Sequence, residues 1–289
     1  MMRNAGQRCG WFATPILLLL ASSYASSSDQ PDVLKIVQLS AAAIQADWQQ
    51  EPNLDDVERD EDTNGGKTTS ETYDALMIYG SPYNHITLRN DVALSSEEAA
   101  RQTQQLQEEL TKRANESPQE RAARIAKYQK EWKRVFVLLR NLKGAFDFKM
   151  MGEETVEGHS VYVIRATPRP DYQANSRETK ILTGMQGTLW IDKESYRWVR
   201  VEAEVIKSVW FGWFIAKVDP GTQFLLEQTP VQDPAQAGIW LPKHFRMTVN
   251  ASVLWHRKEY THDETYRDYR PISGPGALPQ TITIEGSSN

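Results

Sequence analysis

Histidine has the widest choice of chemistry in this sequence, because it serves as acid, base or metal ligand near neutral pH. The five histidines are His85, His159, His244, His256 and His262. None stands four residues from another, which is the spacing of a zinc-binding pair on a helix. His256 and His262 can share one face of a strand, but the sequence gives them no acidic partner and no third ligand. We therefore expect no metal site.

Residues for nucleophilic or acid–base catalysis form no recognisable set. The sequence contains no Gly-x-Ser-x-Gly turn, no identifiable group of Ser, His and Asp, and no glycine-rich phosphate loop that opens a helix after a strand. Asp192 and Glu194 are close together, but they stand at the expected tip of a hairpin, where turn formation and solubility explain them. We expect no enzyme, no catalytic residue and no cofactor.

Residues 51–62 are rich in carboxylates, which could suggest a calcium loop. The acidic residues are Glu51, Asp55, Asp56, Glu58, Asp60, Glu61 and Asp62. Their spacing does not match a twelve-residue EF-hand, and no glycine occupies the turn position of such a loop. We interpret the segment as a solvated edge strand or loop.

The aromatic run 210–214 lies in a segment, 209–216, that is apolar on both faces. One interpretation is a core strand buried on both faces. The other is a strand that lines an apolar cavity on one side, because exposed apolar surface of this size marks binding. A sixteen-carbon acyl chain would gain roughly 12 kcal/mol at ~0.8 kcal/mol per methylene, against association costs of about 4–15 kcal/mol. Such binding would be useful and reversible.

The chain has 289 residues and a formal net charge of −5, so we expect no nucleic acid among its partners. Residues 1–25 have the pattern of a signal peptide, with Arg3 and Arg8 before an apolar run at 16–21. The run is too short to span a membrane. Cys9, the only cysteine, precedes the run, so we expect neither lipidation nor disulfides in the mature chain. The expected location is periplasmic or secreted, with membrane contact transient at most.

The remaining elements are predicted from hydrophobic periodicity. Residues 32–48 repeat apolar side chains at helical spacing. Residues 95–143 predict a helical hairpin, since Ser95 and Ser117 each open a capping box. About nine strands surround this insertion. The predicted fold is α+β, a strongly curved antiparallel sheet (half-barrel) with an N-terminal helix and an inserted helical hairpin, occupying residues 26–270 and followed by a loose tail at 271–289.

Residues 187–206 form the clearest local pattern. Two runs alternate apolar and polar side chains on either side of a short polar turn, which predicts an antiparallel hairpin with one apolar face. That apolar face must be covered, either by the protein's own side chains or by an apolar ligand.

The motifs Gly-Thr-Leu-Trp-Ile-Asp at 187–192, Trp-Val-Arg-Val at 198–201 and Trp-Leu-Pro at 240–242 resemble the central hairpin and following strand of outer-membrane lipoprotein-sorting proteins, the LolA-like superfamily. The chain resembles an exported bacterial branch of it more closely, through the stretches 80–83, 94–98, 146–148, 152–156, 166–170 and 227–229. The resemblance covers residues 32–270 and implies an eleven-stranded half-barrel with an apolar cavity for acyl chains. The helical hairpin departs from small lipoprotein carriers, and residues 90–93 lack the glycine turn common in this branch.

Our first hypothesis is a soluble periplasmic carrier that binds the acyl chain of a lipid or lipoprotein, with the helices as a lid. The predicted cavity wall is Leu189, Ile191, Val199, Val201, Phe211, Trp213, Met247, Val249 and Val253. The alternative is an envelope sensor or interaction module with a filled core, whose helical hairpin docks a protein partner. A continuous apolar cavity above about 300 Å³ would favour the carrier.

Overall fold

The computed structural model describes residues 32–211, 216–232, 238–253 and 256–273. The predicted signal peptide, Trp213 and the tail beyond residue 273 lie outside these residues. No helix in the described ranges is long and apolar enough to cross a membrane.

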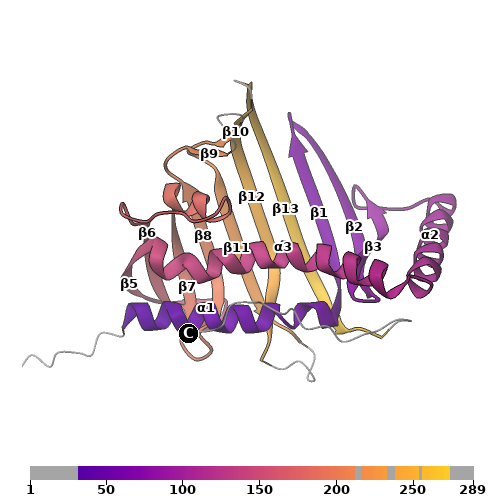
Figure 1. The fold of residues 1–289 in the computed structure, drawn as a ribbon, viewed down its shortest axis with the longest axis horizontal. Coiled ribbons are helices and arrows are strands. Elements are labelled where there is room, and N and C mark those ends of the chain that lie inside the picture. Colours follow the sequence, from indigo (N-terminus) through magenta and orange to yellow (C-terminus); the bar gives the residue numbers. More distant parts are fainter. Residues whose placement is uncertain (1–31, 212–215, 233–237, 254–255, 274–289) are drawn as a thin grey trace, which may run out of the picture. The chain divides into compact units, whose positions relative to one another are not determined.

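The strands form one antiparallel sheet in the order β4-β3-β2-β1-β13-β12-β11-β8-β7-β6-β5, and β10 joins β9 to β12 (Figure 1). The two ends of the order, β4 and β5, do not pair with each other, so the curved sheet stays open. The strands are β1 Leu54–Asn64, β2 Lys67–Ile78, β3 Ser81–Arg89, β4 Val92–Ala93, β5 Phe146–Val156, β6 His159–Pro168, β7 Met185–Asp192, β8 Trp198–Val205, β9 Val209–Phe211, β10 Ala216–Val218, β11 Gln223–Pro230, β12 Trp240–Val253 and β13 His256–Pro271. The α+β prediction is confirmed, but the described residues form thirteen strands in place of the nine predicted or the eleven implied by resemblance.

Three α-helices accompany the sheet in the described ranges. They are α1 Val33–Trp48, α2 Ser96–Ala114 and α3 Pro118–Ala145, with short 3-10 helices η1 Glu51–Asn53 and η2 Thr179–Gly184. Both predicted capping boxes are present, at Ser95 with Glu98 and at Ser117 with Glu120. Figure 1 shows α1 and α3 crossing the same face of the sheet, with α2 beside β3.

The predicted hairpin is β7 and β8, in which Leu189 lies opposite Val201. Asp192 makes its turn, because its Oδ1 accepts the backbone N–H of Glu194 at 3.1 Å and of Ser195 at 2.7 Å. This confirms the turn-forming interpretation of Asp192.

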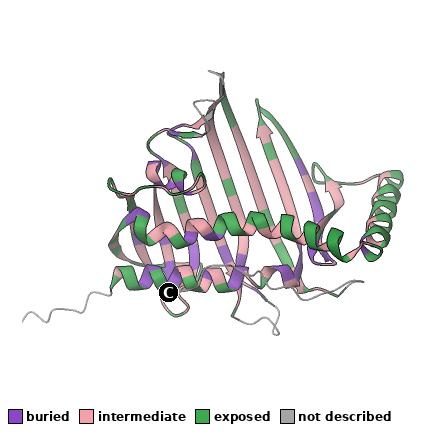
Figure 2. Ribbon diagram, viewed as in Figure 1, coloured by how far each residue is buried: buried purple, intermediate pink, exposed green. Residues whose placement is uncertain are grey.

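The main core lies between this hairpin and the two crossing helices (Figure 2). Its buried members include Ile36, Val37, Ile44 and Trp48 of α1, Phe136 and Leu139 of α3, and Leu189, Ile191 and Trp198 of the hairpin. Each such side chain contributes about 1.5–3 kcal/mol through burial. The protein's own helices therefore supply the cover that the hairpin needs.

The acidic segment is not a solvated edge, and that interpretation is wrong. β1 pairs with β2 on one side and with β13 on the other. Asp55 and Asp56 are each only 7% exposed. The neighbour β13 lies about two hundred residues further along the chain, so local composition could not reveal that this strand is central.

Arg113 anchors the inserted hairpin to the sheet. Its side chain is buried, and Nη1 donates hydrogen bonds to the carbonyls of Ile78 at 2.8 Å and Ser81 at 2.7 Å. Nη2 donates to the carbonyl of Pro82 at 3.2 Å, and Nε to the carboxylate of Glu109 at 2.7 Å. One guanidinium therefore joins α2 to the β2–β3 turn.

Arg113→Met should lower the free energy of unfolding by about 2 kcal/mol, because buried carbonyls lose charged donors. Urea unfolding measures the change. The control is Arg101→Met, which removes an exposed pair with Glu97 on the same helix and should cost less than about 0.5 kcal/mol. Equal losses in the two variants would contradict the anchoring role.

Candidate functional site

The predicted cavity wall is only partly assembled. Leu189 and Ile191 are core members, and Val201 packs against the same cluster, so these three meet α1 and α3 directly. Val199 lies in a second cluster with Val161 and Trp240. The register of β7 and β8 shifts between Trp190 and Ile191. Val199 and Val201 therefore face opposite sides of the sheet although they are two residues apart.

Met247 and Val249 of β12 are half-buried. Met247 lies opposite Phe224 of β11, two residues from Leu226, which packs on the core. Because side chains alternate along a strand, Met247 faces the helix side. The side chains of Phe211, Trp213 and Val253 lie outside the described residues.

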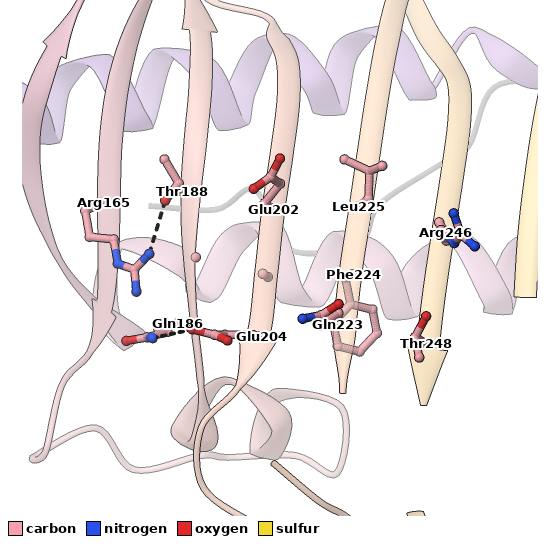
Figure 3. A pocket seen from close by; sticks show the side chains of 12 residues that line it. Arg165, Gln186, Thr188, Glu202, Glu204, Gln223, Phe224, Leu225, Arg246 and Thr248 are labelled. Atoms are coloured by element: carbon pink, nitrogen blue, oxygen red, sulfur yellow. Dashed lines mark hydrogen bonds between the residues drawn. The ribbon is translucent and has the colours of Figure 1, made fainter. Parts of the chain in front are cut away.

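A cavity of about 600 Å³ lies over β6, β7, β8, β11 and β12 (Figure 3). Its side chains include Arg165, Thr188, Glu202 and Arg246, which alternate with the core-facing residues and therefore point away from the helices. Arg165 donates to the hydroxyl of Thr188 at 3.3 Å. The lining carries both signs of charge and combines these polar side chains with Phe224 and Leu225, so it is not the aliphatic cavity that we predicted.

A second cavity, of about 370 Å³, lies on the helix side between α3 and the strands β1, β2 and β13. We call it the acid–tyrosine cavity after the residues that dominate its lining: Glu51, Asp56, Glu58, Asp60, Glu264, Tyr73, Tyr266 and Tyr269. Leu54, Ala75, Met77, Pro82, Asn84, Trp132 and Pro242 complete the lining. No Lys or Arg stands among these described lining residues.

Strand register brings the carboxyls together. Glu58 lies opposite Tyr73 of β2 and Tyr266 of β13, and Asp60 lies opposite Glu264. The alternate residues of β1 share the face of Leu54, which is a core residue beneath the helices. A central strand thus directs its acidic side chains inward.

Burial raises the pKa values of these carboxyls, since the charged form loses its hydration. Burial, with the nearby charge of Asp56, raises the pKa of Glu51 to about 8. Burial raises the pKa of Asp56 to about 7, although Arg270 opposes the shift. Burial and the neighbouring Asp60 also raise the pKa of Glu58. Part of the cluster therefore holds protons near neutral pH.

Two carboxylate oxygens in this cavity lack hydrogen-bond partners within the part of the chain that the structure describes. They are Oδ2 of Asp56 and Oδ1 of Asp60, and both atoms are buried. An unpaired buried polar atom is costly. A cation entering the cavity would satisfy them.

Helix α3 covers the cavity. Trp132 lines it and packs against Trp48 of α1, with ring centroids 6.0 Å apart. The hydroxyl of Tyr128 donates to the Glu51 carboxylate at 2.9 Å. Helix α3 therefore lies over these acids at Trp132 and Tyr128, and it also packs on the aliphatic core through Phe136 and Leu139.

The sequence alone did not predict this site. Its one available signal was the occurrence of Asp56, Glu58, Asp60 and Asp62 at every second position, which places four carboxyls on one face of a strand.

No family model matches the chain, and no curated protein matches it. Among solved structures, a DUF1329 family protein from Desulfovibrio piger is 13% identical and covers 84% of this chain and 94% of its own, with a TM-score of 0.34. A putative outer membrane lipoprotein-sorting protein domain from Vibrio parahaemolyticus is 11% identical and covers 82% and 94%, with a TM-score of 0.36. A LolA superfamily protein from Nitrosomonas europaea is 10% identical and covers 86% and 97%, with a TM-score of 0.31.

Two of these structures carry the lipoprotein-sorting description to which the sequence motifs are similar. TM-scores this low carry no argument about ligand or activity. The function is therefore inferred from the site itself.

Proposed function

We propose that this chain is a binding protein of the cell envelope that holds a cationic group in the acid–tyrosine cavity, with α3 as its cover. The observation that carries the proposal is a helix-covered cavity lined by five carboxyl side chains and, among the described lining residues, by no Lys or Arg. The role is binding rather than catalysis.

The physical argument concerns desolvation. A buried carboxylate is unfavourable unless it is protonated or paired with a positive charge. Asp56 is 7% exposed and keeps one oxygen without a hydrogen-bond partner. A bound cation would replace the protons and pair with these oxygens. Tyr73, Tyr266 and Trp132 supply aromatic faces, which attract organic cations.

Isothermal titration of the purified protein with spermidine at low ionic strength tests this proposal. Asp56→Asn should weaken binding by at least about tenfold, because it removes a buried charge that faces the ligand. Glu202→Gln, which changes a carboxylate on the opposite face of the sheet, should leave the affinity unchanged. Absence of spermidine binding, or equal affinities for wild type and Asp56→Asn, would count against an organic cation.

Stability should fall as pH rises, because folding favours the protonated forms of Glu51 and Asp56. The pKa of Glu51 rises from 4.5 to about 8 and that of Asp56 from 3.8 to about 7. Their contribution is fully present below the unfolded values and is lost as pH rises through the folded values. Between pH 6 and pH 8 the free energy of unfolding should decrease by about 4 kcal/mol, of which Glu51 supplies about 2 kcal/mol.

Urea unfolding at the two pH values measures this decrease. Glu51→Gln should remove the larger part of it, whereas Glu97→Gln, which changes an exposed side chain, should not. A pH dependence that Glu51→Gln leaves intact would show that Glu51 does not hold the proton.

Binding of the acyl chain of a lipid or lipoprotein is a second candidate, favoured by the aliphatic wall of Leu189, Ile191 and Val201 beneath α1 and α3. The helices fill this space, so an acyl chain must displace them. Titration with a fluorescent fatty acid tests the idea, and no uptake by wild type would contradict it.

The filled core equally suits the alternative of an envelope interaction module. In that case the α2–α3 hairpin would contact a protein partner, and no small ligand, cationic or acyl, would bind.

A further inference from the structure

We infer that Asp60, His262 and Glu264 form a binding site for a divalent transition-metal ion at one end of the acid–tyrosine cavity. One ligand atom from each of the three lies within 4.8 Å of the others. The inference deepens the proposed function and rests on it, since it names the cation that this cavity would hold.

The pairing of β1 with β13 brings these three residues together. Asp60 of β1 lies directly opposite Glu264 of β13, and Asp62 lies directly opposite His262. Residues two apart on a strand share a face, so all four side chains project to the same side. The sequence separates the two halves by about two hundred residues, which is why His262 has no visible acidic partner until the strands pair.

The histidine is oriented as metal-binding histidines are. Its Nδ1 contacts Oδ1 of Asp62 at 2.7 Å, and its Nε2 faces Oε1 of Glu264 at 2.6 Å. A carboxylate on one ring nitrogen fixes the tautomer and turns the other nitrogen toward the metal. Asp62 is therefore a positioning residue, and Nε2 is the ligand atom.

The two carboxylates are positioned in the same manner. The hydroxyl of Tyr73 donates to Oδ2 of Asp60, and the hydroxyl of Tyr266 donates to Oε2 of Glu264. In each case a tyrosine binds one oxygen; the other oxygen of Glu264, Oε1, contacts Nε2 of His262, and a metal ion would have to replace that contact. Oδ1 of Asp60 is buried and has no hydrogen-bond partner among ionised or neutral donors of the described residues, while the neighbouring Glu58 carboxyl, whose pKa is raised by burial, shares a proton with the Asp60 carboxylate.

One further carboxylate of the cavity lies outside this site. Asp56 is 7% exposed and has a buried Oδ2 without a hydrogen-bond partner among the described residues. It stands four residues from Asp60 along β1, about 13 Å away in an extended strand, so it belongs to the wider cavity and not to the coordination of the metal ion.

The donor set indicates the class of metal. Calcium and magnesium take oxygen ligands, whereas imidazole nitrogen with carboxylate suits zinc and its neighbours in the first transition row. Three protein ligands leave a coordination position open toward the cavity. The site therefore suits an ion that is exchanged or that carries a further ligand.

Titration of chelator-treated protein with zinc sulfate alone, followed by calorimetry, tests the assignment. We expect one zinc ion per chain. His262→Ala should abolish this binding, and Asp62→Asn, which keeps all three ligands, should weaken it by about 10–100-fold. Cobalt(II) substitution should give a visible absorption spectrum that His262→Ala removes.

The matched control is His244→Ala. His244 also lies between two carboxylates, at 3.4 Å from Glu227 and 3.2 Å from Asp263, but it alternates with Phe245 and so faces the opposite side of the sheet. Its loss should leave zinc affinity unchanged. Equal effects of the two histidine variants, or no zinc binding by wild type, would overturn the assignment.

The zinc and spermidine titrations test the metal site and the proposed function separately. Spermidine binding that depends on Asp56, without zinc binding, would overturn the metal site and leave the proposed function standing. Failure of both titrations would contradict both proposals. Because His262→Ala could disturb folding, each variant is compared by urea unfolding, and Asp62→Asn provides the milder variant.

Discussion

Asp47→Ala is expected to lower the free energy of unfolding by about 3 kcal/mol, because it leaves the half-buried guanidinium of Arg197 and the buried backbone N–H of Trp240 without their acceptor. Asp47 is 3% exposed near the end of α1. Its carboxylate accepts two hydrogen bonds from Arg197, at 2.6 and 2.9 Å, and one from the backbone N–H of Trp240 at 3.1 Å. A single side chain thus joins the first helix to the β7–β8 hairpin and to the start of β12.

Urea unfolding measures this loss, and Glu131→Ala is its control. Glu131 pairs with Arg134 on the exposed surface of α3, and such pairs contribute about 0.3–0.5 kcal/mol. The double variant Asp47→Ala with Arg197→Met should recover part of the loss, because it also removes the half-buried guanidinium that has lost its partner. A loss below about 1 kcal/mol for Asp47→Ala would show that the pair does not hold α1 on the sheet.

The parts of the fold that local periodicity encodes were predictable from sequence. The first helix, both capping boxes and the β7–β8 hairpin appear where the patterns place them. Each depends on residues within a few positions of one another. The pairing of β1 with β13 depends on residues two hundred positions apart, and composition alone made an interior strand look solvated.

In the candidate site, too, the local features could be predicted from sequence and the long-range contacts could not. Leu189, Ile191 and Val201 were predicted to share a wall, and they do meet in one core. Whether that wall was covered by helices or by a ligand depended on how α1 and α3 dock, which no local pattern contains. His262 acquires Asp60 and Glu264 only through strand pairing. The alternation of acidic residues along β1 was the one local feature from which inward-facing carboxyl groups could have been predicted.

Phe136→Ala should be as damaging as the loss of Asp47, and it acts directly on the cover of the acid–tyrosine cavity. Phe136 is completely buried in α3 and stacks on Trp132, with ring centroids 5.8 Å apart. Truncation removes buried apolar surface and leaves a void, which together cost about 3–5 kcal/mol. Trp132, which lines the cavity, loses its neighbour.

The control is Val135→Ala, one residue away on the same helix, since Val135 is 36% exposed. Val135→Ala should lower the free energy of unfolding by well under half as much as Phe136→Ala does, because it returns less buried apolar area to water. Hydrogen exchange followed residue by residue then locates the damage. Faster exchange confined to α2 and α3 would mean that the cover opens as a unit. Such opening gives a cation its route to the carboxyls, whereas uniform acceleration would mean that α3 belongs to one cooperative core and that the cavity is closed by it.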